Sequence, residues 1–229
     1  MEAPGPDRVD VLVVAAHAPE MAGLRVHLSD RLAGRIRGLE VRGKAVGIGL
    51  AAAGPATARA LLSADPRALI LIGSCGVYPG LPHYRPHDVL VASRVRLLSH
   101  AVTAERSAFP APMQTSVETD RLLTAGLSQP GGRVFVAPVA NPLARTTDDT
   151  LAAAIHPATH CEGENLEAFA VAMAARAAGV PFAAVFGVAN LVGSTGDHDW
   201  RQFQREAVNR AAEVLTAWLQ TGAPGLPHG

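Results

Sequence analysis

Continuous apolar runs alternate along this chain with stretches in which apolar residues recur at helical spacing. The runs typical of strands covered on both faces span residues 9–16, 68–73, 88–97 and 182–188. The stretches with helical spacing span residues 19–32, 51–64, 165–178 and 200–219. Residues 39–49 indicate one or two more strands that meet at Gly43. Alternating strands and helices predict an α/β domain with a mostly parallel sheet.

The region of residues 99–149 shows no clear periodicity. Five prolines interrupt it, and loops of this kind often carry substrate contacts. No repeat or linker divides the chain, so we expect residues 1–229 to form a single domain. Flexible tails are expected at residues 1–8 and 222–229.

Composition narrows the class of ligand. The chain has 229 residues, of which 48% are hydrophobic and 17% charged, and this excludes a largely disordered protein. Its 20 basic residues balance 20 acidic ones, so no charge excess favours nucleic acid or a membrane as partner. The longest apolar stretch is too short to cross a bilayer, and the first ten residues hold no apolar signal core. We therefore expect a cytoplasmic protein with free thiols that binds a small, partly apolar molecule.

Polar residues follow the predicted strands at four places. In a mostly parallel sheet, ligands bind outside the carboxyl ends of the strands. The places are residues 17–20, a Gly-Ser-Cys-Gly turn at residues 73–76, residues 161–167, and residues 189–190. Carboxylates from two of them and an amide from a third would surround one pocket. The alternative for Glu20 is that it only lies in the first turn of a helix, where its negative charge interacts favourably with the helix dipole.

Three glutamates crowd the start of the helix predicted at residues 165–178. Glu162 and Glu164 are interpreted as capping or solvated charges. Glu167 differs because its neighbours are apolar, and a carboxylate in such surroundings needs a partner. Sugar hydroxyls are suitable donors to it.

Other chemistry-bearing patterns are weaker. His156 and His160 have i,i+4 spacing but lack the glutamate of an HExxH motif, so no metal site is expected. Cys75 follows a strand as a nucleophile would, yet Gly-x-Ser-x-Gly is not met around Ser74. No GxGxxG follows the first strand, which disfavours a dinucleotide cofactor. We expect no cofactor.

Five segments in this order resemble the purine nucleoside phosphorylase and nucleosidase superfamily over residues 9–219. They are VLVVAAHAPEMAGL, VGIGLAAAGPATA, ALILIGSCGVYPG, ENLEAFAVA and GVPFAAVFGVANLVG. The last of them, followed by Trp200, is similar to the end of the futalosine hydrolases, which are nucleosidases of menaquinone biosynthesis. The resemblance implies a three-layer α/β sandwich with a mixed, mostly parallel central sheet, and a homodimer or larger homo-oligomer.

The resemblance also implies roles for particular residues. Glu20 would position and deprotonate the attacking water, and Asn190 stands where many nucleosidases have an aspartate at purine N7. Glu167 would hold the ribose 2′- and 3′-hydroxyls. The other residues that would line the substrate pocket are Ser74, Cys75, Gly76, Asn165, Leu166 and Phe169.

Hydrolysis and phosphorolysis differ in whether an anion is bound. Leu71 stands where related phosphorylases carry an arginine, and phosphate binding needs such groups. Water is therefore the predicted nucleophile. Asn190 can donate to N7 and O6 of a 6-oxopurine, but a flipped amide can also accept from adenine. Futalosine, which carries hypoxanthine, is the predicted substrate. The alternatives are methylthioadenosine or adenosylhomocysteine hydrolysis and purine nucleoside phosphorolysis.

Four residues at three places depart from the nucleosidase pattern. Phe186 and Gly187 replace a segment with an arginine, Ala189 replaces a serine, and His87 stands where a glycine is typical. These departures leave open a second class of function, a catalytically inactive nucleoside-binding protein. That reading requires Asn190 to point away from the pocket, or Phe186 to fill the base site.

Overall fold

The computed structural model describes residues 9–228, so the flexible tail expected at residues 1–8 lies outside the described residues. The strands are β1 (Val11–Ala15), β2 (Ala33–Ile36), β3 (Leu39–Ala45), β4 (Ala68–Val77), β5 (Val89–Leu98), β6 (Ser116–Glu118), β7 (Val134–Pro142), β8 (Gly163–Glu164) and β9 (Phe182–Leu191). The helices are the 3₁₀ helix η1 (Ala18–Val26) and the α-helices α1 (Leu50–Ala64), α2 (His100–Thr103), α3 (Arg121–Ser128), α4 (Asp149–Thr159), α5 (Ala168–Ala177) and α6 (Gly196–Gln220).

The nine strands form one mixed sheet in the order β2-β3-β1-β4-β8-β7-β5-β6, and β9 pairs with both β4 and β5. The pairs β3–β1, β1–β4, β4–β9, β5–β7 and β7–β8 are parallel. Because β9 joins β4 to β5 on one side while β8 and β7 join them on the other, five strands close a circuit. This curvature brings β4, β8 and β9 together.

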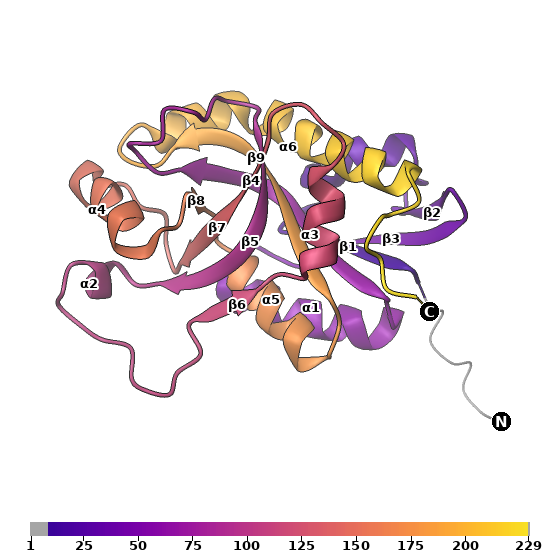
Figure 1. Cartoon of the computed structure of the whole chain (residues 1–229), viewed down its shortest axis with the longest axis horizontal. Coiled ribbons are helices and arrows are strands. Elements are labelled where there is room, and N and C mark those ends of the chain that lie inside the picture. Colours follow the sequence, from indigo (N-terminus) through magenta and orange to yellow (C-terminus); the bar gives the residue numbers. More distant parts are fainter. Residues whose placement is uncertain (1–8, 229) are drawn as a thin grey trace.

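Helices cover both faces of the sheet (Figure 1). Strand β1 shows why, since its residues alternate between two apolar clusters. Leu12 and Val14 pack in the cluster with α1 and α5, whereas Val11 and Val13 pack in the cluster with η1, α3 and α6. The predicted three-layer α/β sandwich is therefore confirmed.

Helix α6 lies unusually close to strand β9. A Cβ atom on Gly187 would overlap the backbone carbonyl group of Ala207, so only glycine permits this approach. The position that departs from the nucleosidase pattern thus fixes how the last strand and the last helix pack.

Two local predictions are wrong. The segment of residues 73–76 is not a turn but part of β4, because β8 and β9 pair with it on both sides. The register with β9 shifts between Cys75 and Gly76. The helix that begins near Pro19 is a 3₁₀ helix that ends at Val26, short of the predicted Leu32.

The region without periodicity holds regular structure after all. It contains α2, β6, α3 and β7, and two of its prolines lie within β7, where they hide the strand pattern. Part of the tail expected to be flexible from residue 222 packs against the rest of the chain. Ala223 is buried, and Pro224 accepts a hydrogen bond from the indole of Trp218 at 2.9 Å.

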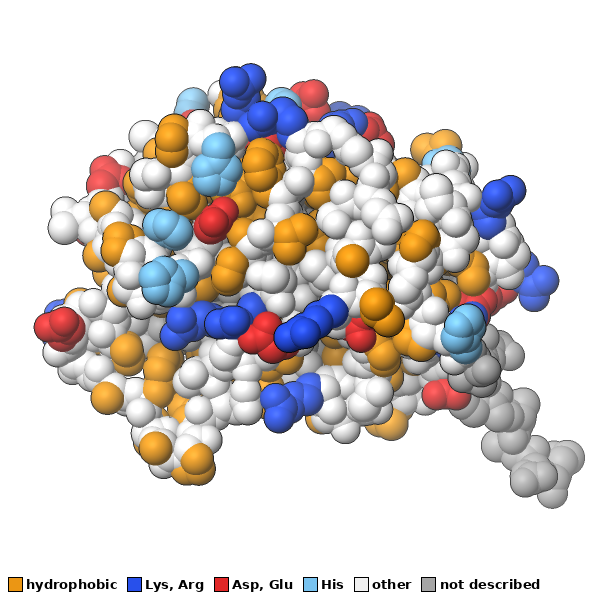
Figure 2. Space-filling model, viewed as in Figure 1, with side chains coloured by type: hydrophobic (Ala, Val, Ile, Leu, Met, Phe, Trp, Pro, Cys, Tyr) orange, Lys and Arg blue, Asp and Glu red, His pale blue; other side chains and the backbone are white. Residues whose placement is uncertain are grey.

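The surface carries both signs of charge. Figure 2 shows basic and acidic side chains next to one another on the face in view, in keeping with a formal net charge of zero. No helix in residues 9–228 is long and apolar enough to cross a membrane. Within the same residues, no group of three or more His, Cys, Asp or Glu side chains could hold a metal ion.

Candidate active site

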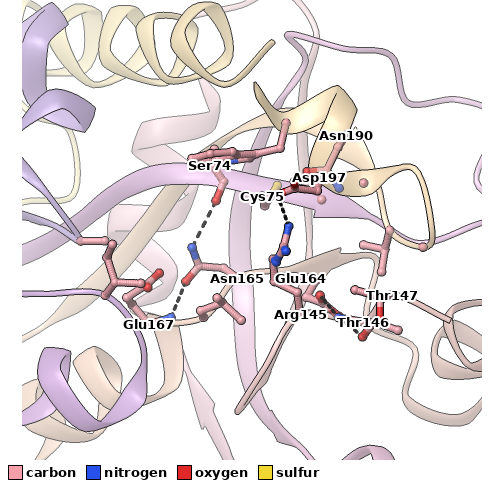
Figure 3. A pocket seen from close by; sticks show the side chains of 18 of the residues that line it. Ser74, Cys75, Arg145, Thr146, Thr147, Glu164, Asn165, Glu167, Asn190 and Asp197 are labelled. Atoms are coloured by element: carbon pink, nitrogen blue, oxygen red, sulfur yellow. Dashed lines mark hydrogen bonds and ion pairs between the residues drawn. The ribbon is translucent and has the colours of Figure 1, made fainter. Parts of the chain in front are cut away.

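A cavity of about 500 Å³ opens where β4, β8 and β9 end, and this size suits a nucleoside-sized ligand (Figure 3). All four places singled out in the sequence contribute to it. Eight of the nine predicted site residues line it, namely Glu20, Ser74, Cys75, Gly76, Asn165, Leu166, Glu167 and Asn190. Lining residues that were not among the predicted site residues include Arg145, Thr146, Glu164, Asp197 and Trp200.

Glu167 is a buried carboxylate at the start of α5. Its side chain accepts a hydrogen bond from the backbone N–H of Gly49 at 2.7 Å. Gly49 has a φ of 81°, a conformation that favours glycine and turns this N–H toward the cavity. Burial raises the pKa of Glu167 to about 7, the Gly49 N–H opposes that rise, and the charge of Glu20 adds to it.

Glu20 is the second buried carboxylate at this end of the cavity. One of its oxygens accepts from the backbone N–H of His17 at 3.3 Å and lies 3.2 Å from the imidazole Nδ1 of the same residue. Burial raises the pKa of Glu20, and the nearby His17 opposes the rise. A Cβ on Gly73 would come within 3.2 Å of the carboxylate, so glycine leaves room for it.

Asn165 positions Glu167. Its Oδ1 accepts from the backbone N–H groups of Glu167 and Ala168, both at 2.9 Å, as an N-terminal helix cap does. Its Nδ2 donates to the Ser74 carbonyl at 3.2 Å and ties the helix start to β4. Asn165 and the half-buried Leu166 beside it both line the cavity.

The three consecutive predicted residues of β4 differ in what they offer. The hydroxyl of Ser74 accepts a hydrogen bond from the indole N–H of Trp200 at 3.1 Å. Burial raises the pKa of the Cys75 thiol, so Cys75 stays neutral and is a poor nucleophile. Gly76 is required because a Cβ there would lie 2.8 Å from Asn190 Nδ2.

Asn190 is the second-last residue of β9 and lines the cavity. Its Nδ2 donates to the Leu191 carbonyl at 2.8 Å. Phe186, four residues earlier, is fully buried in the core cluster of α1 and α5 and does not line the cavity. Neither of the two conditions set for a catalytically inactive binding protein is therefore met, since Asn190 lines the cavity and Phe186 does not fill it.

Glu164 corrects the sequence interpretation, which treated it as a cap or a solvated charge. It is only 8% exposed and lines the cavity. It accepts from the Thr146 N–H at 2.9 Å, the Thr146 hydroxyl at 2.5 Å and the Tyr78 hydroxyl at 2.9 Å. Figure 3 places Glu164 and Thr146 at one end of the cavity and Glu167 at the other.

Phe169 also corrects the sequence interpretation, because it does not line the cavity. Successive helical residues are about 100° apart, so a residue two positions after Glu167 points to nearly the opposite side. Phe169 is buried in the core with α1 instead, and its backbone N–H donates to Asn141 at 2.8 Å.

The mouth of the cavity carries an ion pair that the sequence did not reveal. Arg145 contacts Asp197 at 2.6 Å, and Arg201 contacts the same carboxylate at 3.0 Å. The side chains of Arg145 and Arg201 lower the pKa of Asp197. Arg145 is the sole Arg or Lys among the residues found to line the cavity, and it is already paired.

The cavity therefore has two chemically different ends. One end holds two carboxylates with raised pKa values, which suits a proton acceptor and a partner for hydroxyl groups. The other end holds a hydrogen-bonded carboxylate and a side-chain amide, which suits recognition of a polar ring edge.

Solved structures of nucleosidases share this fold. The 5′-methylthioadenosine/S-adenosylhomocysteine nucleosidase of Neisseria meningitidis, in complex with methylthio-immucillin-A, is 19% identical with a TM-score of 0.82, covering 93% of this chain and 99% of that one. The S-adenosylhomocysteine nucleosidase of Streptococcus pyogenes is 23% identical with a TM-score of 0.83, covering 96% and 98%. The futalosine hydrolase of Helicobacter pylori is 13% identical with a TM-score of 0.80, covering 93% and 98%.

Two comparisons of the sequence itself bear on the family of the chain. The chain has no significant match among curated proteins. A family model described as the phosphorylase superfamily matches residues 13–220, which is nearly all of the chain. The chain therefore belongs to the phosphorylase superfamily.

Proposed function

We propose that this protein is a nucleosidase that hydrolyses the N-glycosidic bond of a purine nucleoside. The observation that carries the proposal is the pair of buried carboxylates, Glu20 and Glu167, at one end of a nucleoside-sized cavity. Burial raises the pKa of both groups, which brings them toward neutral pH, where acid–base catalysis is most effective.

The proposed reaction uses the two ends of the cavity differently. Cleavage of the bond between C1′ and N9 builds positive charge on the ribose and negative charge on the purine. Glu167 accepts hydrogen bonds from the ribose hydroxyls, and its charge stabilises the sugar cation. Glu20 takes a proton from the water whose oxygen bonds to C1′. Asn190 donates a hydrogen bond to N7 of the leaving purine. The purine anion takes up a proton from solvent water, and Glu20 returns to solvent the proton that it accepted, so the reaction balances.

Water rather than phosphate is the proposed nucleophile. Phosphate recognition needs cationic groups or a cluster of N–H donors. Arg145 is held by Asp197 at the mouth of the cavity, and the Gly49 N–H already binds Glu167. The sugar end of the cavity is thus lined by carboxylates, which would repel an anion.

Futalosine is the lead substrate in this proposal. The support is the similarity of residues 179–193 to the futalosine hydrolases and a fold shared with the Helicobacter pylori enzyme. Methylthioadenosine and adenosylhomocysteine are equal alternatives on fold, because nucleosidases named for them match as well. A cytoplasmic homodimer or larger homo-oligomer belongs to the same proposal, and light scattering after size exclusion would test its assembly.

The test is a chromatographic screen of the purified protein with futalosine, aminofutalosine, methylthioadenosine, adenosylhomocysteine and inosine, each with and without phosphate. We expect free purine and free sugar to appear without phosphate. Release of sugar 1-phosphate only when phosphate is present would make the protein a phosphorylase instead. Binding of these nucleosides without cleavage would support the inactive binding protein.

A further inference from the structure

His17 lines the carboxylate end of the cavity and takes no part in the reaction proposed above. It is the residue immediately before η1. Its imidazole Nδ1 lies 3.2 Å from Oε2 of Glu20. The backbone N–H of His17 donates to the same oxygen at 3.3 Å. The side chain and the backbone of one residue thus both face the carboxylate that we assign as the general base.

The Nδ1 atom of His17 is buried and has no hydrogen-bond partner within residues 9–228. Buried polar atoms rarely stay unpaired, and a proton on Nδ1 would have Oε2 of Glu20 within hydrogen-bonding distance. The rest of the imidazole reaches solvent, since 37% of the His17 side chain is exposed. His17 can therefore take a proton from solvent and present it to a carboxylate that is itself buried.

The carboxylate end of the cavity has little positive charge to offset its negative charge. Glu20 and Glu167 are both buried there, and buried charges need partners. Among the described residues that line the cavity, His17 and Arg145 are the only side chains that can be cationic. Arg145 is already paired with Asp197 at the mouth. Protonated His17 is therefore the cation available to the two carboxylates.

The other titratable groups that line the cavity do not replace this cation. Strand β4 supplies the neutral thiol of Cys75, and β8 supplies Glu164, which Figure 3 places at the opposite end from Glu167. Burial raises the pKa of both Glu20 and Glu167, and the charge of His17 opposes both rises. The geometry and the charges thus agree on which group balances the pair.

We propose that His17 is a positioning residue for Glu20, whose protonated imidazole donates to Oε2 and keeps the carboxylate ionised and oriented toward the attacking water. This inference rests on the proposed nucleosidase function, because it explains how the assigned base stays ready to act. A buried carboxylate without a counter-charge tends to keep its proton, and protonated Glu20 cannot accept another from water. His17 forms no bond to the substrate. The proton of water goes to Glu20 and from there to solvent.

A purely structural role for His17 makes a different prediction. His17 and Glu20 occupy the two positions of a capping box at the start of η1. If His17 only begins this helix, its charge is irrelevant and any good N-cap residue would serve. Asparagine is such a residue, and its amide can also donate a hydrogen bond, but it carries no charge. His17→Asn therefore keeps the cap and removes the cation.

The first experiment measures kcat/KM from pH 5 to pH 9, with the nucleoside that the protein cleaves fastest. We expect the ratio of wild type to His17→Asn to be at least about 5-fold larger at pH 5 than at pH 9, because Glu20 without its cation is protonated more readily. His83→Asn is the matched control, since His83 lies 3.6 Å from Glu162 outside the cavity. It should leave the pH profile unchanged. A ratio for His17→Asn that does not vary with pH would overturn the inference.

The second experiment needs no turnover. ¹³C NMR of protein labelled at the glutamate carboxyl carbons follows Glu20 directly, and its signal is identified by its absence in Glu20→Gln. We expect Glu20 to titrate at higher pH in His17→Asn than in wild type, and at the same pH in His83→Asn as in wild type. Titration of Glu20 at the same pH in all three proteins would overturn the inference. If His17→Asn does not fold, His17→Ser takes its place, because serine also caps helices.

Failure of the inference and failure of the proposed function look different. Cleavage of a nucleoside with a pH profile that is the same in His17→Asn keeps the nucleosidase and removes the role of His17. Absence of cleavage, with a titration of Glu20 that moves in His17→Asn, removes the hydrolase and keeps the pairing of His17 with Glu20.

Discussion

Glu164 and Glu167 are two buried glutamates three residues apart, yet they sit in opposite hydrogen-bonding environments. Glu164 accepts three hydrogen bonds from Tyr78 and Thr146. Glu167 accepts one from the Gly49 N–H, and burial raises its pKa to about 7. The protein has thus supplied most partners of one carboxylate and few partners of the other. An under-bonded buried carboxylate is costly to the fold, and it is this group that a ribose diol would complete.

The sharpest test of the sugar end is Glu20→Gln. If Glu20 takes the proton of water, kcat should fall by about 10²- to 10⁴-fold, the range for general base catalysis. This corresponds to about 3–5 kcal/mol in the barrier. The kinetics would be measured with futalosine and aminofutalosine, and the dissociation constant of futalosine should change little. If Glu20→Gln left kcat intact and instead changed the ratio of kcat/KM for the two substrates, the two ends of the cavity would not have the separate roles given to them here.

The pH dependence of stability tests the free-energy cost of burying the charged carboxylate of Glu167. Its folded-state pKa, about 7, is above the ordinary value, so its contribution to stability is complete below about pH 4.5 and is lost as pH rises through 7. Glu167→Gln should therefore be more stable than wild type at pH 8, by up to about 3 kcal/mol, and nearly equal at pH 4. Urea unfolding at both pH values checks this. Glu162→Gln is the control, and an unchanged difference at the two pH values would contradict the expectation.

The partners of Glu164 can be removed one at a time. Tyr78→Phe deletes the hydroxyl that donates to Glu164 and keeps the ring. We expect it to lower the free energy of unfolding by about 1.5–3 kcal/mol, the range for hydrogen bonds to charged groups. Tyr84→Phe, whose hydroxyl bonds to the more exposed Glu162, is the matched control and should cost less. Equal losses in both variants would remove the distinction drawn for Glu164.

The smallest expected effect is at the cavity wall. Trp200→Phe removes the indole N–H that donates to Ser74, a neutral hydrogen bond in a half-buried position. The expected loss of unfolding free energy is about 0.5–1.5 kcal/mol, measured by urea unfolding at pH 7. A loss above 3 kcal/mol would show that Trp200 supports the fold rather than the cavity wall.

The sequence predicted Glu167 and missed Glu164 for the same physical reason. The apolar neighbours of Glu167 are adjacent in the chain, so its burial shows in a short window. The partners of Glu164 lie 86 and 18 residues away, and β8, which carries it, has two residues and no periodicity. Strands longer than four residues were mostly foreseen, whereas contacts made by the curvature of the sheet were not.

Phe169 shows the opposite error, because it was predicted to line the site and does not. Its place beside Glu167 in the chain suggested a shared site, but the helix turns it to the core. Arg145 and Asp197 are 52 residues apart, and no pattern in the sequence pairs them. The sequence was therefore enough to predict that the four polar places meet at one pocket, but only some of the side chains that line the pocket could be predicted.

The missing side chain of Gly187 also has a mechanical consequence. At the contact between Gly187 and Ala207, no side chain separates β9 from α6, so we expect the two elements to move together about this point. Asn190 lies three residues beyond this pivot along the strand, and Trp200 lies seven residues from it along the helix. At the rise of each element, both arms are about 10 Å long. We therefore expect a ligand that displaces Asn190 to displace Trp200 as well, so that the two walls of the cavity respond together.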